Sequence, residues 1–353
     1  MAQPMGLTAS DIEFAEATPE QRRISWELCS RKWAAPMSVD DYVEREQHMA
    51  EHELNRDGGC RYWVLYLKGY PRQVIASCET LRKPMFIADC AERRVREAHG
   101  YVVTNVYTNP TYRRQGMAAF LLRRVQERMD ADSDCSLPDL CQKDIAHLTR
   151  TLTSLVTATA ASNNNNTSIC FLPTYAQISW HLARAKFDAL KILPSTTMAT
   201  TPLTVGAVTL PSQQGVAWAC WSHDWRNKRL RVLRLAREGD SRVEGGAGKE
   251  DEVLEEVEEG SDVAVDETAC VDVAALLEAA VAEARQWGFL EVVVWNPSDL
   301  VKMGCKSVGN ALPDEVKVVF EQRVEGCVPS LRWKGGKVLA GVVWEENHGY
   351  CGC

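Results

Sequence analysis

One short loop contains the side chains best suited to bind a charged ligand. Arg113 and Arg114 are followed, one residue later, by Gly116. The planar guanidinium group of arginine suits phosphate oxygens, and glycine lets the backbone approach a ligand that a Cβ atom would repel. The loop is therefore a candidate site for an anion such as a diphosphate.

The loop is expected to join a strand to a helix. Residues 101–108 are apolar and β-branched, which favours a half-buried strand. From Gly116 onward, apolar residues recur at helical spacing. The first N–H groups of a helix have no internal partner and carry the positive end of its dipole, so they would help to hold the anion.

The overall charge does not favour a nucleic-acid partner. The formal net charge is −8, but positions 238–268 contain thirteen acidic residues and only two basic ones. The rest of the chain is close to neutral, so neither nucleic acid nor an anionic membrane is expected as a partner. With 353 residues, the chain can form two domains with separate cores.

Cysteine usage and the N-terminus bear on the compartment. The 13 cysteines are odd in number and irregularly spaced, and the N-terminal residues lack the basic and apolar regions of a signal peptide. No run approaches the roughly 18 apolar residues of a membrane-spanning helix. We therefore expect free thiols and a cytoplasmic protein.

The first third of the chain predicts the element order β-α-α-β-β-β-α. Thr18 followed by Pro19 is a helix start, and Ser38 is a second N-cap. Residues 83–99 are expected to form a charged excursion between strands. The expected strands cover 12–18, 61–67, 73–79 and 101–108, and the expected helices cover 19–33, 39–55 and 116–129.

The remainder is more heterogeneous. Residues 149–168 are rich in Thr and Ala and end in an Asn run, which is typical of a disordered or variable insertion. Positions 238–268 are expected to form a disordered acidic linker. Helices are expected within 171–190 and 271–287, and strands at 215–220, 229–235, 290–295, 330–333 and 338–344.

The run Arg113-Arg114-Gln115-Gly116-Met117-Ala118 resembles the R/Q-x-x-G-x-G/A acetyl-CoA loop of the GNAT N-acetyltransferases. The resemblance implies an α/β (α+β) GNAT acyl-CoA N-acyltransferase fold, with a mixed central sheet, flanking helices and an additional C-terminal αβ domain. It implies a GNAT N-terminal part at 1–130 and a variable insertion with an atypical remainder of that domain at 131–210. The C-terminal αβ domain, interrupted by the acidic linker, would occupy 211–353.

Further segments resemble the fungal L-lysine N6-acetyltransferases. They are the runs at 33–36, 41–46, 77–80, 106–108, 287–288, 295–297 and 330–333, with Asn347 and Tyr350 near the C-terminus. This resemblance implies transfer of an acetyl group from acetyl-CoA directly to the ε-amine of free L-lysine in a ternary complex. The reaction would open a cytoplasmic route of lysine catabolism and would use no metal.

The resemblance also implies roles for particular residues. Main-chain groups at the end of the strand would pair with the pantetheine of acetyl-CoA, and the loop would hold its diphosphate. Glu79 is the candidate base, although a surface ion pair is the alternative, and Tyr175 is a candidate acid. Trp33 could form a wall of the substrate pocket or simply pack at a helix end. The expected acetyl-CoA contacts are Val106, Tyr107, Thr108, Arg113, Arg114, Gln115, Gly116, Met117 and Ala118.

One segment departs from the family. Tyr175 precedes the expected helix, whereas the family has a tyrosine within it, and the resemblance stops near Asp130 and resumes near Pro194. We therefore hypothesise that residues 131–193 are mis-spliced or frame-shifted. Two alternative functions remain: a protein N-acetyltransferase, and a catalytically impaired acetyl-CoA-binding protein.

Two short motifs could hold a metal. Residues 48–52 match the H-x-x-E-H zinc-protease pattern, and Cys351 and Cys353 are separated by a single residue. The first is expected to be a solvated helix and the second a pair of frayed terminal thiols, because no further ligand is suggested.

Overall fold

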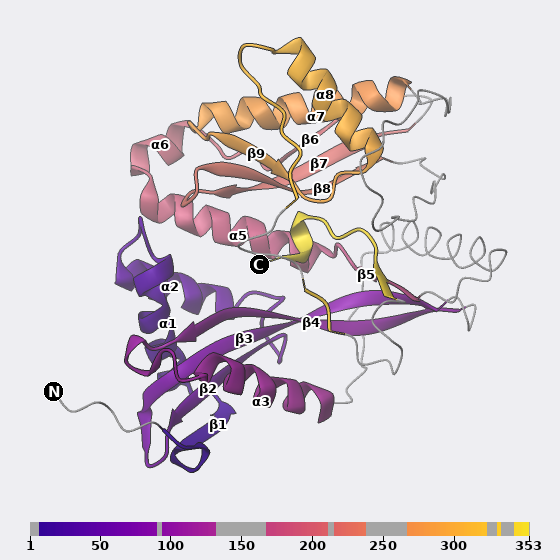
Figure 1. Ribbon diagram of the computed structural model, residues 1–353. Coiled ribbons are helices and arrows are strands. Elements are labelled where there is room, and N and C mark those ends of the chain that lie inside the picture. Colours follow the sequence, from indigo (N-terminus) through magenta and orange to yellow (C-terminus); the bar gives the residue numbers. More distant parts are fainter. Residues whose placement is uncertain are drawn as a thin grey trace.

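The computed structural model describes residues 7–89, 94–131, 167–210, 215–237, 267–322, 330–332 and 342–352. In this part of the chain two β-sheets lie one above the other, with helix α5 (Tyr175–Ile192) between them (Figure 1). Trp180 of α5 packs in a core cluster with residues of the first sheet, and Ala189 packs in the core of the second. The helix therefore connects the two cores.

The N-terminal elements follow the predicted order. Thr18 accepts a hydrogen bond from the N–H of Gln21 at 3.3 Å and begins α1. Ser38 accepts one from the N–H of Asp41 at 3.1 Å and begins α2. The elements are β1 (Ile12–Glu16), α1 (Pro19–Trp33), α2 (Val39–Ala50), β2 (Cys60–Leu67), β3 (Tyr70–Asp89), β4 (Arg94–Thr108) and α3 (Met117–Ala131). The order β-α-α-β-β-β-α is confirmed.

The charged excursion expected at 83–99 is wrong. Strands β3 and β4 continue through it as one long antiparallel hairpin, paired from Ala76 with Thr108 to Asp89 with Arg94. Residues 85–88 are all buried, because elements from distant parts of the chain cover this half of the hairpin. The local sequence contains no sign of that cover.

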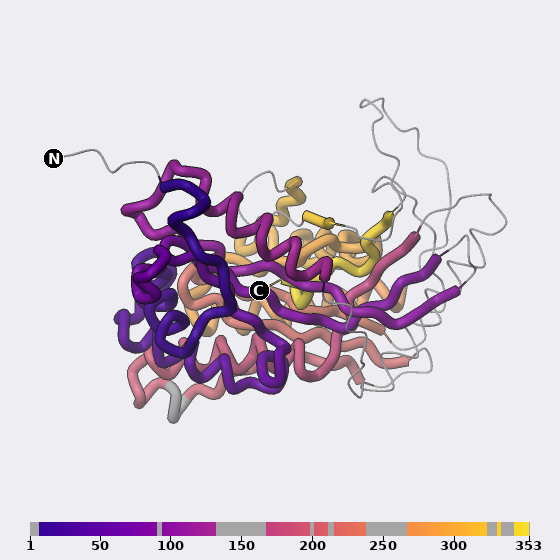
Figure 2. The backbone as a smooth tube through the Cα atoms, turned by 90° about the horizontal axis from the view of Figure 1, so that it is seen from below, coloured from indigo at the N-terminus to yellow at the C-terminus, as the bar shows by residue number. Residues whose placement is uncertain are grey.

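The far half of the hairpin is completed by two short strands. β5 (Thr167–Phe171) pairs antiparallel with residues 85–89 of β3, on the edge that β2 occupies nearer the start of β3. β10 (Val342–Trp344) pairs parallel with β5. Figure 2 shows the hairpin in purple with these pink and yellow strands near its far end. β10 thus belongs to the first sheet, although the sequence suggests a separate domain from residue 211 onward.

The structure also answers the hypothesis of a mis-spliced segment for its second half. All five residues of β5 are buried, and α5 is capped by Thr174, whose side chain accepts a hydrogen bond from the N–H of Gln177 at 3.2 Å. A foreign sequence would not be expected to complete both cores, so this packing argues against the hypothesis for 167–193, and sequencing the transcript remains its test. Residues 132–166, with most of the expected insertion, lie outside the described residues.

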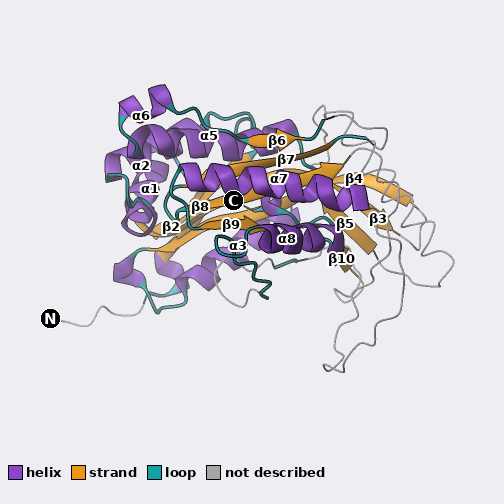
Figure 3. Cartoon of the chain, turned by 90° about the horizontal axis from the view of Figure 1, so that it is seen from above, coloured by secondary structure: helices purple, strands orange, loops and turns teal. Residues whose placement is uncertain are grey.

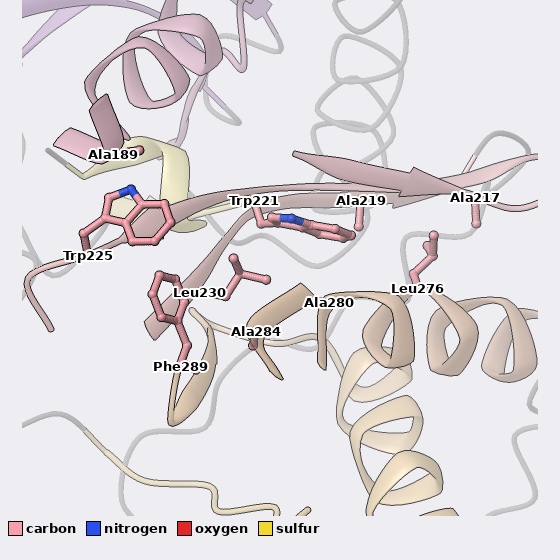
Figure 4. Packing of buried hydrophobic residues seen from close by; sticks show 10 residues of the cluster. All are labelled: Ala189, Ala217, Ala219, Trp221, Trp225, Leu230, Leu276, Ala280, Ala284 and Phe289. Atoms are coloured by element: carbon pink, nitrogen blue, oxygen red, sulfur yellow. The ribbon is translucent and has the colours of Figure 1, made fainter. Parts of the chain in front are cut away.

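The second sheet has the strand order β6-β7-β8-β9, with α7 and α8 over its outer face (Figure 3). Its core contains Trp221, Leu230 and Phe289 together with Leu276 and Ala280 of α7 (Figure 4). The elements are α6 (Ser195–Thr200), β6 (Gly206–Val208), β7 (Ala217–Asp224), β8 (Arg229–Arg237), α7 (Glu267–Gln286), β9 (Glu291–Val294) and α8 (Asp299–Ala311). Residues 238–266 of the expected acidic linker lie outside the described residues, and its last two residues begin α7.

The C-terminal residues differ from the expectation of a frayed end. Residues 349–351 form a 3-10 turn between the sheets, and Cys351 is only 3% exposed. The strand expected at 330–333 is irregular over its described residues, where Arg332 forms a two-pronged ion pair with Asp130 at 2.8 and 2.6 Å. None of the helices in the described ranges is both long and apolar enough to cross a membrane.

Candidate active site

The loop between β4 and α3 has the backbone shape of an anion site. The side chain of Asn109 donates to the carbonyl of Val74 at 3.1 Å and accepts from the N–H of Thr111 at 3.3 Å, which fixes the start of the loop. Arg114 and Gly116 have positive φ angles, 63° and 75°. A Cβ built on Gly116 would meet no heavy atom within 4 Å, so open space faces the backbone where α3 begins. A diphosphate therefore fits this position.

The side chains of the loop differ in how far they are exposed and in what they contact. Arg113 donates through Nε to the carbonyl of Thr108 at 3.2 Å, and its guanidinium carbon lies 5.3 Å from the ring centre of Tyr107. Arg114 is exposed. Met117 is buried in the core beneath α3, so it offers a ligand only its main chain. Gln115 and Ala118 are half-buried.

A cleft of about 1440 Å³ runs along the free edge of β4. Among the described strands, β4 pairs only with β3, so its other edge has no strand partner. Residues 98–106 of β4 form one wall, with α3, α5 and the second sheet around them. Alternate residues of a strand direct their N–H and C=O groups to each edge. This wall therefore offers main-chain donors and acceptors to an extended ligand.

β4 contains a bulge beside this edge. Between Ser77 and Glu79 of β3 the pairing shifts by one residue on β4, and Asn105 has a φ of 51°. An asparagine tolerates this left-handed conformation better than most residues. The bulge interrupts the ladder where Asn105 and Val106 line the cleft.

Glu79 lies behind this bulge and is poised to titrate near neutral pH. Burial, and after it the negative charge of Glu46, raise the pKa of its carboxyl group to about 7. Asn105, Arg184 and Trp26 oppose this shift by favouring the charged form. Glu79 itself does not line the cleft, but its side chain forms a hydrogen bond with Asn105, which does.

Glu46 belongs to a buried charge cluster that joins α2 to α5. The guanidinium of Arg45 contacts Glu46 at 2.5 Å and Asp188 at 3.1 Å. Burial disfavours the charged form of Glu46, but Arg45 and then Arg184 outweigh it, and its pKa is lowered. Glu46 is therefore ionised at neutral pH, which explains why it raises the pKa of Glu79.

The structure brings some predicted residues together and leaves others apart. Trp33 ends α1, lines the cleft and packs edge-on against Tyr107, with ring centres 5.8 Å apart. Val106 also lines the cleft. Tyr107, Thr108 and the loop residues 113–118 come next in the chain and do not line it. Tyr175 is the first residue of α5, is 73% exposed and does not line the cleft.

Asn105, Arg184 and Asp188 are among the polar residues of the cleft that sequence reasoning missed. For Asn105 a signal existed, because an asparagine inside an apolar β-branched strand often marks a bulge. Arg184 and Asp188 stand four residues apart on a predicted helix, but whether their side chains face the cleft depends on how α5 lies between the sheets. That packing cannot be read from the local pattern.

The two histidines of the H-x-x-E-H pattern contact other side chains of the protein and do not converge on a metal site. His48 stacks on Phe187 with ring centres 5.4 Å apart, and His52 lies beyond the end of α2 and contacts Ser179 Oγ at 3.3 Å. Within the described ranges, no group of three or more His, Cys, Asp or Glu side chains is placed to hold a metal ion.

Residues 130–353 match the family described as LYC1 GNAT-like C-terminal domain, and the chain belongs to this family. The GNAT-type fold expected from the sequence is thereby confirmed, with a mixed first sheet and a further αβ layer.

Individual relatives are distant. A stretch of 108 residues is 25% identical to a lysine acetyltransferase of Yarrowia lipolytica (strain CLIB 122 / E 150). It covers 31% of this chain and 27% of that protein, so the match spans about a quarter of the relative. A possible acetyltransferase from Clostridium difficile 630 is 15% identical, with a TM-score of 0.26, over 40% of this chain and 89% of that one. A GCN5-related N-acetyltransferase from Kribbella flavida is 14% identical, with a TM-score of 0.31, over 65% and 59%.

Proposed function

We propose that this chain transfers the acetyl group of acetyl-CoA to the ε-amine of free L-lysine. One observation carries the proposal: the open edge of β4 runs along the cleft and continues into the Gly116 loop and the N-terminus of α3. The edge suits pantetheine, and the loop suits the diphosphate. Family membership supports the acetyl donor, and the name of the Yarrowia relative supports lysine as acceptor.

The acceptor must lose a proton before it can react. A lysine ε-amine has a pKa of about 10.4, so at neutral pH it arrives as an ammonium ion that cannot attack. A base whose pKa lies near the working pH is the most effective, and the pKa of Glu79 is raised to about 7. In this proposal Glu79 accepts the proton through a water molecule beside Asn105.

The remaining steps follow from thioester chemistry. The free amine attacks the carbonyl carbon, a C–N bond forms, and the C–S bond breaks to release the CoA thiolate. The proton that the nitrogen loses as it becomes an amide passes through water to this thiolate. Main-chain N–H groups next to the β4 bulge would stabilise the negative charge on the carbonyl oxygen. A thiol has a pKa of about 8.5, so the thiolate can take its proton from water and does not require a strong acid. This makes the exposed position of Tyr175 compatible with turnover.

The experiment uses purified full-length protein, acetyl-CoA and a thiol reagent. Thiol release is followed with free L-lysine and, separately, with a basic peptide whose N-terminus is blocked. Saturable release with L-lysine supports the proposal. Release with the peptide alone contradicts it and favours a protein N-acetyltransferase. Binding of acetyl-CoA without release from either amine contradicts it in favour of a catalytically impaired acetyl-CoA-binding protein.

A further inference from the structure

The face of α5 that borders the cleft carries one cation and one anion a single turn apart. Arg184 and Asp188 both line the cleft, together with Trp180, His181 and Ala185 of the same helix. Residues four apart on a helix lie on the same face. The two opposite charges therefore stand side by side on the wall of the cleft.

The positive charge of Arg184 is available to a ligand. Its guanidinium carbon lies 5.5 Å from the centre of the Trp180 ring, a cation–π contact that fixes the position of the group. Arg184 is half-buried, and it forms no ion pair with any residue in the described ranges. A planar guanidinium in this position suits a carboxylate, which it can bind through two hydrogen bonds.

The negative charge of Asp188 is only partly used. Arg45 donates to both of its oxygens, at 3.1 and 3.3 Å. A carboxylate has about four acceptor positions, so two remain for another donor. The Asp188 side chain is 18% exposed, whereas Arg45 behind it is 3% exposed. Arg45, which also lines the cleft but is almost fully buried, therefore holds Asp188 in place, and part of the Asp188 carboxylate remains exposed.

We propose that Arg184 binds the α-carboxylate and Asp188 the α-ammonium group of a free amino acid. The inference deepens the proposed function and rests on it for the identity of the side chain. Within a peptide these two groups are uncharged amides, which gain little from either residue and leave the charge of Arg184 without a carboxylate partner. The pair would thus select free lysine over lysine in a protein.

The position of this pair fits the rest of the site. The positive charge of Arg184 acts on both Glu46 and Glu79, so the guanidinium lies within electrostatic reach of the candidate base. A lysine side chain has a flexible four-carbon stem. With its α-groups held by α5, the ε-amine can cross the cleft towards the bulge at Asn105.

The test measures binding by isothermal titration calorimetry in the presence of CoA. L-lysine is compared with lysinamide, which lacks the α-carboxylate, and with 6-aminohexanoate, which lacks the α-ammonium group. Arg184→Gln should weaken L-lysine binding about 10- to 100-fold and leave lysinamide unchanged. Asp188→Asn should weaken L-lysine binding and leave 6-aminohexanoate unchanged.

Lys186→Gln is the matched control, because it removes one positive charge from an exposed position of the same helix outside the cleft lining. It should bind all three compounds as the wild type does. Asp188→Asn also deprives the buried Arg45 of a charged partner. If that variant fails to fold, Arg184→Gln alone decides between the outcomes.

The inference is overturned if Arg184→Gln weakens lysinamide and L-lysine equally, if it weakens neither, or if the wild type binds none of the three compounds. Thiol release separates this inference from the proposed function. Arg184-dependent binding of L-lysine without thiol release contradicts the proposed function alone. Turnover of L-lysine that is insensitive to Arg184→Gln contradicts this inference alone.

Discussion

The ammonium nitrogen of Lys83 lies 3.0 Å from the carbonyl oxygen of Cys351 and donates a hydrogen bond to it. It also donates to the carbonyls of Tyr350 and Gly352, at 3.3 and 3.1 Å, so all three N–H donors are used. Lys83 is 1% exposed. Strand β3 of the first sheet thereby fixes the C-terminal turn, and Cys351 and Gly352 of this turn line the cleft.

Replacing Lys83 should therefore destabilise the whole protein. Lys83→Met keeps the length of the side chain but leaves buried carbonyl oxygens without their donor. We expect the free energy of unfolding, measured by urea denaturation, to fall by about 1–3 kcal/mol. Lys68→Met is the control, because Lys68 is exposed, and it should change the free energy by less than about 0.5 kcal/mol. Equal effects of the two substitutions would show that the buried contact does not stabilise the fold.

A methyl group on Gly116 should impair acetyl-CoA binding specifically. Gly116→Ala places a Cβ in the open space where the diphosphate is proposed to bind, and it strains a φ of 75°. We expect acetyl-CoA binding, measured by calorimetry, to weaken about 10-fold or more, since hydrogen bonds from the loop to a charged group would be lost.

Gly69→Ala is a matched control for this prediction. Gly69 has a φ of 77°, and a Cβ there would also meet no heavy atom within 4 Å, but the residue lies in the turn before β3. Both variants carry the same backbone strain of about 1–2 kcal/mol. If both bind acetyl-CoA equally well, the loop is not the diphosphate site.

Glu79→Gln should remove the base without changing the shape of the side chain. We expect kcat/KM for L-lysine to fall about 10²- to 10⁴-fold, with acetyl-CoA binding retained. In the wild type, kcat/KM should rise with pH and level off above the pKa of Glu79, which is about 7. That inflection should disappear from the pH profile of the variant. An unchanged inflection would assign the base to another residue.

Glu79 also predicts how stability depends on pH. Its pKa is raised from 4.5 to about 7 in the folded protein, so between these values the folded state binds more protons than the unfolded state. Stability therefore falls as pH rises through this range. Glu79→Gln should raise the melting temperature above pH 7 and have little effect below pH 4.5. A gap between variant and wild type that does not change with pH would contradict the raised pKa.

The parts of the fold that could be predicted have local causes. The helix starts at Thr18 and Ser38, and the strand-loop-helix around Gly116, follow from capping, periodicity and glycine chemistry. β5 could not be found in a segment rich in Thr and Asn, because its burial comes from β3 and β10. β-strand preference depends strongly on such distant partners.

The same distinction applies to the candidate site. The loop from Arg113 to Ala118 could be located because its residues are contiguous. Arg184 and Asp188 reach the cleft only because α5 lies between two sheets formed by distant parts of the chain. Glu79 could be named from its strand, but its raised pKa depends on burial by distant elements and on the charge of Glu46.

Identifying the acetylated product tests most sharply whether the protein acetylates the ε-amine of free lysine. Wild-type protein is incubated with acetyl-CoA and free L-lysine, and the amine is analysed by tandem mass spectrometry while thiol release is followed. Transfer to free lysine predicts N6-acetyl-L-lysine, formed in equal amount to the released CoA. Thiol release without acetylated lysine, or acetylation of the α-amine, would contradict the account.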